Sequence, residues 1–372
     1  MRSAFYIAAL TVALGLLASC DDAVPSDPAP CASATGDEWE FLGLQDDTLG
    51  YVRAVAIDPA DPARILAGTT SDATGGLLGH LFLSEDDGVS WQQVLESPRS
   101  FIDVVFDSSN PATVYAATLL GVYRSVDGGL TWIYSSPDIC IDPETGLTFL
   151  RRSSDGLLYA GTAGNLGGCP FTMYRSEDEA QTWEDLCKGQ SGCLPNGPFT
   201  LAIDPSDPQR LLAGLKRTFG MQESTNGGDT WTTNGYDQAG YAAGIAVDVD
   251  DSETIYVGHS MGGASRSTDG GEVWMTFDTG LQEDAVGDNI VQDAQTGTLY
   301  LLASFDTAGV LWRRETGSDS WKLFGIAGED LRVEGALSVT EDQILYVGSY
   351  GLWRRDLTVI PANEPGPCGP KA

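Results

Sequence analysis

Three carboxylates, Asp103, Asp288 and Glu334, are the residues of this chain that could take part in hydrolysis. Glycoside hydrolysis needs two carboxyl groups that flank the scissile bond. The three candidates lie in no catalytic motif, in a chain with 53 Asp and Glu residues. The two histidines, His80 and His259, have no cysteine or carboxylate at ligand spacing, and the sequence contains neither Gly-x-Ser-x-Gly nor a phosphate loop. We therefore expect no metal and no cofactor, and binding rather than catalysis.

A second group of residues could recognise a partner, because aromatic side chains with a few charges suit contacts to a protein or a glycan. The candidates are His80, Lys216, Arg217, Phe219, Tyr236, Tyr241, His259, Phe305 and Tyr350. They fall in or beside loops that we expect to lie together on one face of the molecule. These loops are 70–80, 135–145, 163–170, 187–198, 215–221, 234–243, 278–289 and 304–309.

An eight-residue repeat, Ser-x-Asp-x-Gly-x-Thr-Trp, marks the elements that must position these residues. Five copies are nearly complete, SEDDGVSW, SVDGGLTW, SEDEAQTW, STNGGDTW and STDGGEVW, whereas RETGSDSW keeps little beyond its tryptophan. The carboxylate can accept hydrogen bonds from turn N–H groups, and glycine permits positive φ. The repeat residues are therefore expected to be structural: Ser84, Asp86, Gly88, Trp91, Ser125, Asp127, Gly129, Trp132, Ser176, Asp178, Trp183, Ser224, Asn226, Gly228, Trp231, Ser267, Asp269, Gly271 and Trp274.

The repeat resembles the Asp-box (BNR) motif of bacterial sialidases, and it is similar to repeats of xyloglucanases, sortilin-type receptors and photosystem II assembly factors. Sialidases of this kind need an arginine cluster, and no Phe-Arg-Ile-Pro-like segment is present here. The resemblance implies a propeller whose binding sites lie on the face away from the Asp-boxes. It leaves a sialidase- or xyloglucanase-type glycoside hydrolase as the weakest functional alternative.

The spacing of the tryptophans predicts how many blades there are. Each copy is preceded by a recognisable unit. Before SEDDGVSW and STNGGDTW this unit is a strand, an Asp-Pro turn, a strand, a loop and a third strand, so the tryptophan strand completes a four-stranded antiparallel blade. Trp39 opens a fourth strand without a blade, and the last unit, which reaches Trp353, lacks its fourth strand. We therefore predict an all-β, seven-bladed β-propeller in which the strand at Trp39 completes the C-terminal blade and leaves no open sheet edge.

The N-terminal segment predicts export. Residues 1–19 read as a signal peptide, and Leu17-Ala18-Ser19-Cys20 resembles a bacterial lipobox, which implies cleavage before Cys20 and lipid attachment to its sulfur. The expected organisation is then a lipidated cysteine and tether over 20–37, the propeller over 38–358 and a Pro/Gly-rich tail over 359–372. Processing removes one charged residue, so the net charge goes from −33 to −34. Such a surface disfavours nucleic acid.

Six cysteines remain after Cys20, and export places them where disulfides persist. Fifteen pairings are possible from the sequence alone. The predicted ring favours Cys140–Cys169 and Cys187–Cys193, with Cys31–Cys368 as a clasp at the closing blade. The basic pairs Arg151-Arg152, Arg313-Arg314 and Arg354-Arg355 are expected to be solvated strand positions.

The sequence thus predicts a monomeric lipoprotein of the cell envelope, on its periplasmic or surface side, that binds an envelope protein without catalysis. The alternative is a carbohydrate-binding surface protein, and the identity of the ligand stays open.

Overall fold

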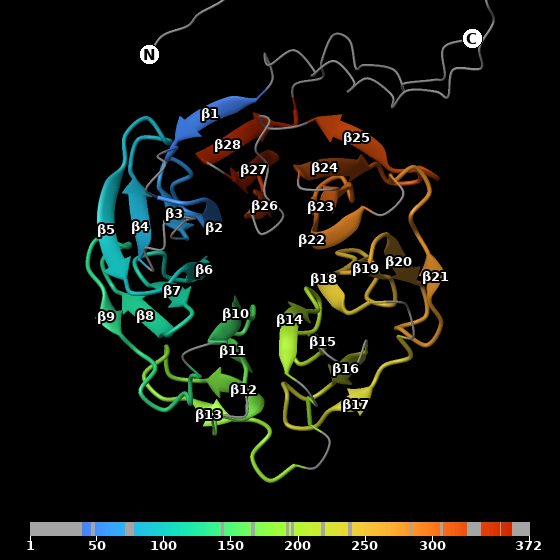
Figure 1. Ribbon diagram of the computed structural model, residues 1–372, viewed down its shortest axis with the longest axis horizontal. Helices are drawn as coiled ribbons and strands as arrows, with labels where there is room; N and C mark the ends of the chain where they lie inside the picture. The colour runs from blue at the N-terminus through green and yellow to red at the C-terminus, as the bar shows by residue number, and fades with distance from the viewer. Residues whose placement is uncertain are drawn as a thin grey trace, which may run out of the picture. The chain divides into compact units, whose positions relative to one another are not determined.

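The computed structural model describes residues 39–45, 49–70, 78–142, 145–164, 168–190, 193–194, 197–216, 220–236, 240–282, 285–305, 308–325, 336–349 and 351–358. These residues form seven four-stranded antiparallel sheets in a ring, as predicted (Figure 1). In each sheet the first strand lies nearest the centre and the fourth lies at the rim (Figure 1). No helix in this part of the chain has the length and apolar character needed to cross a membrane.

The blades follow one another along the chain. The first three are β2 (Val52–Ile57), β3 (Ile65–Thr69), β4 (Gly79–Ser84) and β5 (Gln92–Ser97); β6 (Phe101–Phe106), β7 (Val114–Thr118), β8 (Gly121–Ser125) and β9 (Ile133–Tyr134); and β10 (Leu147–Arg152), β11 (Leu158–Ala163), β12 (Phe171–Ser176) and β13 (Glu184–Asp185). The next two are β14 (Pro198–Ile203), β15 (Leu211–Leu215), β16 (Met221–Ser224) and β17 (Thr232–Thr233); and β18 (Ala242–Val247), β19 (Ile255–His259), β20 (Ala264–Ser267) and β21 (Met275–Thr276). Blade 6 holds β22 (Val286–Gln292), β23 (Leu299–Phe305), β24 (Ala308–Arg314) and β25 (Lys322–Gly325). Blade 7 holds β26 (Leu337–Val339), β27 (Ile344–Ser349), β28 (Gly351–Asp356) and, from the other end of the chain, β1 (Glu40–Gly43).

The ring closes through β1, which pairs antiparallel with β28 in the register Glu40↔Arg354 and Phe41↔Trp353. The rings of Phe41 and Trp353 lie 4.7 Å apart, and the Nε1 of Trp91 in blade 1 donates to the carbonyl of Leu42 at 2.6 Å. The closing strand therefore holds blade 7 together and also joins it to blade 1.

The core lies between adjacent blades. The second strand of most blades is buried along its whole length, as in VYAAT of β7 and LLAGL of β15. Small residues let neighbouring blades approach closely: a Cβ on Gly348 would lie 2.4 Å from the carbonyl oxygen of Val52, and one on Gly214 would lie 2.5 Å from that of Ala242. The alternation of small and large side chains therefore sets the spacing of the blades.

The five turns of the repeat share one hydrogen-bond pattern, at the ends of the third strands of blades 1 to 5. In blade 2 the hydroxyl of Ser125 donates to Asp127 at 2.7 Å and accepts the N–H of Gly129 at 2.9 Å. The carboxylate of Asp127 also accepts the N–H of Thr131 at 2.9 Å and its hydroxyl at 2.6 Å. In blade 3, where Ala180 replaces the glycine, it adopts the same positive φ, at 64°. The carboxylates thus accept hydrogen bonds within their own turns and stabilise them.

The hydrogen bonds of Asp127 predict that the stability of the protein depends on the protonation of this carboxylate. The hydrogen bonds from Thr131 lower the pKa of Asp127 to about 2, below the 3.8 of an unperturbed carboxyl. Because the folded pKa is the lower one, its stabilising contribution is complete above about pH 4 and is lost as the pH falls to about 2. We expect Asp127→Ala to lower the free energy of unfolding at pH 7 by about 1 to 2 kcal/mol, measured by urea denaturation.

Asp127→Asn is the matched control, because Asn226 occupies the same place in blade 4 and accepts the N–H of Thr230 at 3.0 Å. This variant should stay near wild-type stability at pH 7 and lose less stability than the wild type between pH 4 and pH 2. An equal loss in both chains would contradict the role of the Asp127 carboxylate.

Arginines at the third strands link neighbouring blades. Arg124 pairs with Glu179, Arg175 pairs with Asp229 at 2.8 Å, and Arg354 pairs with Asp87 across the closure. In each case a third strand reaches the turn of the following blade. Ion pairs as well as apolar contacts therefore stabilise the junctions between neighbouring blades.

The expectation that the basic pairs are solvated is wrong, most clearly for Arg152 and Arg355. Arg152 pairs with Asp107 at 2.7 Å, and its side chain is 9% exposed. Arg355 is 7% exposed, and its guanidinium lies 4.2 Å from the ring centroid of Phe324. The interfaces between blades bury these cations because aromatic rings and carboxylates are available there.

Candidate functional site

Two disulfides stiffen one sector of the ring, and both are the pairs that the predicted fold favoured. Cys140 and Cys169 lie 5.4 Å apart between Cα atoms, and so do Cys187 and Cys193. The first joins the entry of blade 3 to the loop before β12. The second closes a six-residue separation just after β13. The clasp Cys31–Cys368 lies outside the described residues.

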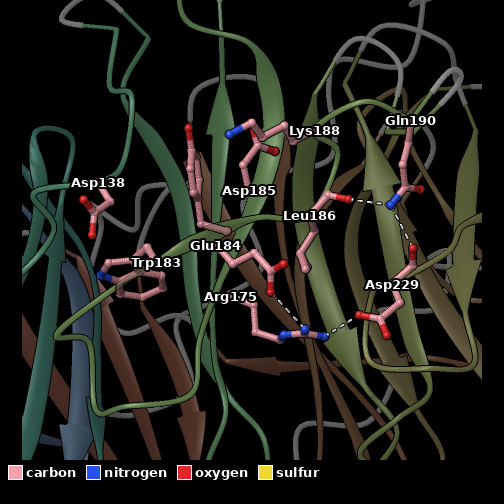
Figure 2. Close-up of a pocket in the computed structure, with 10 residues that line it drawn as sticks. Asp138, Arg175, Trp183, Glu184, Asp185, Leu186, Lys188, Gln190 and Asp229 are labelled. Atoms are coloured by element: carbon pink, nitrogen blue, oxygen red, sulfur yellow. Dashed lines mark hydrogen bonds and ion pairs between the residues drawn. The ribbon is translucent and has the colours of Figure 1, made fainter.

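An open groove of about 910 Å³ lies beside this second disulfide, at the rim of blades 3 and 4 (Figure 2). It is lined by Asp138, Tyr174, Arg175, Trp183, Glu184, Asp185, Leu186, Lys188, Gln190 and Asp229. The short β13 supplies two of these residues, and the disulfide-closed loop that follows it supplies Lys188 and Gln190. The loop is held in place because the side-chain amide of Gln190 donates to the carbonyls of Leu186 and Asp229, both at 2.8 Å.

Arg175 lies at the base of the groove between two carboxylates (Figure 2). It pairs with Glu184 at 3.1 Å and with Asp229 at 2.8 Å. Partial burial opposes the charge, but the hydrogen bond and charge of Asp229 raise the pKa of Arg175 above its usual range. The lining carries four carboxylates and two cations, so the groove is net acidic. Because Glu184 and Asp229 neutralise Arg175, the acidic excess that the groove offers to a partner comes from Asp138 and Asp185.

An exposed apolar strip continues the groove onto blade 2. Ile133 and Tyr134, which make up β9, are 61% and 52% exposed. The next residue, Ser135, accepts the Nε1 hydrogen bond of Trp183 through its carbonyl at 2.8 Å, and Trp183 directly precedes β13. The segment that carries the strip therefore also reaches the groove, which its residue Asp138 lines. We call this combined area, made of Ile133, Tyr134, Asp138, Glu184, Lys188 and Asp229, the rim surface.

Of the three candidate catalytic carboxylates, only Asp103 has a described side chain. It lies on β6 at the inner side of the ring, where it pairs with Arg151 of the next blade and accepts the N–H of Leu150 at 3.0 Å. Asp288 belongs to β22, without a described side chain, and Glu334 lies outside the described residues. Asp103 thus holds two blades together.

The structure places the predicted binding residues in different environments. Lys216 lies 5.4 Å from the ring centroid of Phe199, and that ring contacts Tyr241 edge-on at 5.1 Å. This makes a small aromatic cluster at the junction of blades 4 and 5. His80 lies on β4, half-buried, with Nδ1 3.9 Å from Glu96 of the neighbouring strand β5. Phe199 was not predicted from the sequence.

Two other candidates are core residues. Tyr236 and His259 are 5% and 6% exposed, and Tyr236 packs edge-on against both His259 and Trp274. Burial lowers the pKa of His259 to about 4, although Asp278 opposes this shift. We therefore place both residues between blades rather than on a binding surface.

The remaining predicted residues have no described side chain. Phe305 has no described side chain, and Cys20, Arg217, Phe219 and Tyr350 lie outside the described residues. Among the residues described, no cluster of three or more His, Cys, Asp or Glu side chains could hold a metal ion.

Sequence reasoning found the loop 187–198 but not the groove beside it. The groove depends on Arg175 and Asp229, which are 54 residues apart and belong to different blades. One feature of the sequence indicates the groove: Cys187 and Cys193 lie in a loop that follows the acidic pair Glu184-Asp185.

The fold defines the chain as a seven-bladed β-propeller. No family model matches it. Two solved structures of YCF48 share the fold: that of the protein from Cyanidioschyzon merolae has a TM-score of 0.62, with 14% identity, and covers 87% of this chain and 100% of its own. A structure of YCF48 bound to D1 peptide also has a TM-score of 0.62, with 16% identity, and covers 88% of this chain and 97% of its own.

Two curated proteins are similar in sequence. A xyloglucanase from Paenibacillus sp is 29% identical over 311 residues, which is 76% of this chain and 27% of the enzyme. The vacuolar protein sorting/targeting protein 10 of Emericella nidulans is 30% identical over 116 residues, or 30% of this chain and 8% of that protein. The chain therefore spans about a quarter or less of these relatives. The predicted resemblance to assembly-factor and xyloglucanase propellers is confirmed.

Proposed function

We propose that this protein is a non-catalytic scaffold that binds a protein partner through the rim surface. The observation that carries this proposal is the junction of exposed apolar side chains, Ile133 and Tyr134, with the exposed carboxylates of the groove. Exposed apolar patches rimmed by polar residues mark interaction sites. We further propose that the repeated turns are Asp-boxes, which the shared hydrogen-bond pattern supports.

The chemistry of the rim surface selects the partner. Glu184 and Asp229 are paired with Arg175, so the acidic excess of the groove comes from Asp185 and the exposed Asp138. The whole chain carries a charge of −33. A segment that carries apolar and basic residues would bury the strip and neutralise the groove. The two-residue strand β9 also presents its outer edge, to which an extended segment can add. YCF48, which shares the fold, binds a peptide.

The test is capture of the partner from native envelopes by chemical crosslinking with an affinity-tagged chain. The rim variant combines Ile133→Ser with Asp138→Lys, which removes one apolar anchor and reverses one charge. We expect recovery of the crosslinked partner to fall at least about tenfold.

Blade 5 supplies a matched control. Met275 is 49% exposed on the equivalent outer strand β21, and Glu272 lies exposed before it. Met275→Ser with Glu272→Lys changes the same chemistry on another blade and should leave recovery unchanged. Equal losses in the two variants would reject the rim surface as the docking site.

Carbohydrate binding is the second candidate, because the xyloglucanase similarity covers 76% of this chain. A glycan array that includes xyloglucan oligosaccharides separates the two functions. A strong and specific glycan signal would replace the protein partner by a sugar. Release of reducing ends from xyloglucan would support the hydrolase alternative.

We also propose that the chain is exported and anchored by lipid on Cys20 in the cell envelope. The lipobox-like sequence supports this, as do the two disulfides, which are typical of oxidising compartments. The Cys20→Ser chain should appear in the soluble fraction when envelopes are separated by centrifugation. Continued sedimentation with the membrane would count against the anchor.

A further inference from the structure

The sixth copy of the repeat differs from the others where its third strand ends. Strands β4, β8, β12, β16 and β20 all end on the turn serine, whereas β24 ends on Arg314. Three residues later, Gly317 stands where Asp87 and Glu179 stand in blades 1 and 3. Blade 6 therefore places a cation where blades 1 to 5 place a hydroxyl, and it lacks an acid that serves other junctions.

Arg314 meets a second arginine at the junction of blades 5 and 6. Its guanidinium lies 3.7 Å from the ring centroid of Phe277, and the guanidinium of Arg266 on β20 lies 5.0 Å from the same centroid. Both side chains are half-buried. Burial and the charge of Arg266 lower the pKa of Arg314 below its usual range. Two like charges thus share one aromatic ring.

The described residues offer these two cations no carboxylate within 4.0 Å. The Nε of Arg266 and one terminal nitrogen of Arg314 are buried without a hydrogen-bond partner in the described part of the chain. Asp319 acts on Arg314 only from a distance, as a favourable charge. This arrangement is unusual in a chain with a net charge of −33.

The next junction shows how the same arrangement is completed internally. There Arg313 and Arg355 lie 4.6 and 4.2 Å from the ring centroid of Phe324. Arg313 is neutralised by Glu315, two residues further on, at 3.1 Å. Arg175 is likewise paired with Glu177 at 3.3 Å. The equivalent residue after Arg266 is Thr268, so this junction lacks the internal acid.

We propose that Arg266, Arg314 and Phe277 form a binding site for an oxyanion, a carboxylate, sulfate or phosphate group, between blades 5 and 6. The anion takes the place that Glu315 occupies at the next junction. Guanidinium groups favour such ligands because their N–H donors match the spacing of the oxygens. The phenyl ring orients the cations and excludes water from one side. The site is independent of the rim surface.

The test measures the thermal unfolding midpoint, Tm, of the purified full-length chain in low-millimolar sodium sulfate, phosphate or acetate. Sodium chloride at equal ionic strength is the reference. Binding to the folded state raises Tm, and we expect a rise of about 2 °C for the preferred anion. Preference for acetate identifies a carboxylate ligand, whereas preference for sulfate or phosphate identifies a tetrahedral one.

Thr268→Glu is the decisive variant, because it adds the missing acid and removes neither cation. It should raise Tm in chloride and abolish the specific response to the anions. Arg266→Gln should also abolish the response, which keeps the test valid if Thr268→Glu fails to fold. Arg124→Gln, which breaks a completed ion pair, should keep it. Equal responses in the wild type, Thr268→Glu and Arg266→Gln would overturn the proposal.

Discussion

A chain without residues 38–45 is expected to lose at least about 10 °C of its unfolding midpoint and to self-associate. The deletion removes β1, whose Leu42 is 6% exposed and packs with Val52, Ile65 and Leu352. Loss of one such buried leucine alone costs about 2 to 5 kcal/mol, and each kcal/mol corresponds to about 2 to 4 °C in a domain of 150–250 residues. Removing β1 also leaves β28 as an open edge that can pair with another chain.

Calorimetry and light scattering measure the two effects. A chain that lacks residues 21–30, the part of the proposed tether before Cys31, is the matched control and should keep the wild-type midpoint and stay monomeric. A synthetic peptide of residues 38–45 should restore part of the lost stability, whereas the same peptide with Leu42→Asp should not. An unchanged midpoint in the 38–45 deletion would show that the ring does not depend on its closing strand.

Replacing His259 by phenylalanine should flatten the dependence of stability on pH between 4 and 6.5. Burial lowers the pKa of His259 to about 4, against 6.5 for the unperturbed side chain. As the pH falls below 6.5 the unfolded chain takes up a proton that the folded chain refuses, so stability declines until the pH nears 4. The decline amounts to roughly 3 kcal/mol. Urea unfolding at pH 7, 5.5 and 4.5 measures it.

Asp278→Asn is an informative companion variant. The Asp278 charge raises the pKa of His259 in opposition to burial, so its removal should lower that pKa further and extend the decline to lower pH. His259→Phe keeps an aromatic ring against Tyr236 and should therefore fold. Parallel pH profiles in the wild type and His259→Phe would show that this histidine does not control the transition.

The ring could be predicted from the sequence because its determinants are local. Each turn is made within eight residues, as Ser125, Asp127 and Thr131 show, and the tryptophans mark one strand per blade. The unpaired strand at Trp39 then fixed the closure. The disulfide partners followed from the order of the strands, because both members of each pair fall in the loops of one sector.

The surface could not be predicted in this way because it depends on contacts between blades. Whether a side chain is exposed depends on which residues of the next blade pack against it. Tyr236 and His259 are buried by such contacts, whereas Ile133 is exposed. Likewise Arg175 finds its acid on blade 4, and Arg355 finds its ring on blade 6. Residue type and repeat position do not distinguish these cases.

The closing strand has a mechanical consequence. When the predicted Cys31–Cys368 clasp is reduced, a pulling force applied at the N-terminus enters the ring through β1. This strand is held by three cross-strand pairs, Glu40↔Arg354, Phe41↔Trp353 and Gly43↔Leu352. Every other strand is continuous with its own blade. Under tension this strand should therefore separate first, and the force that the whole ring withstands should be set by these three cross-strand pairs.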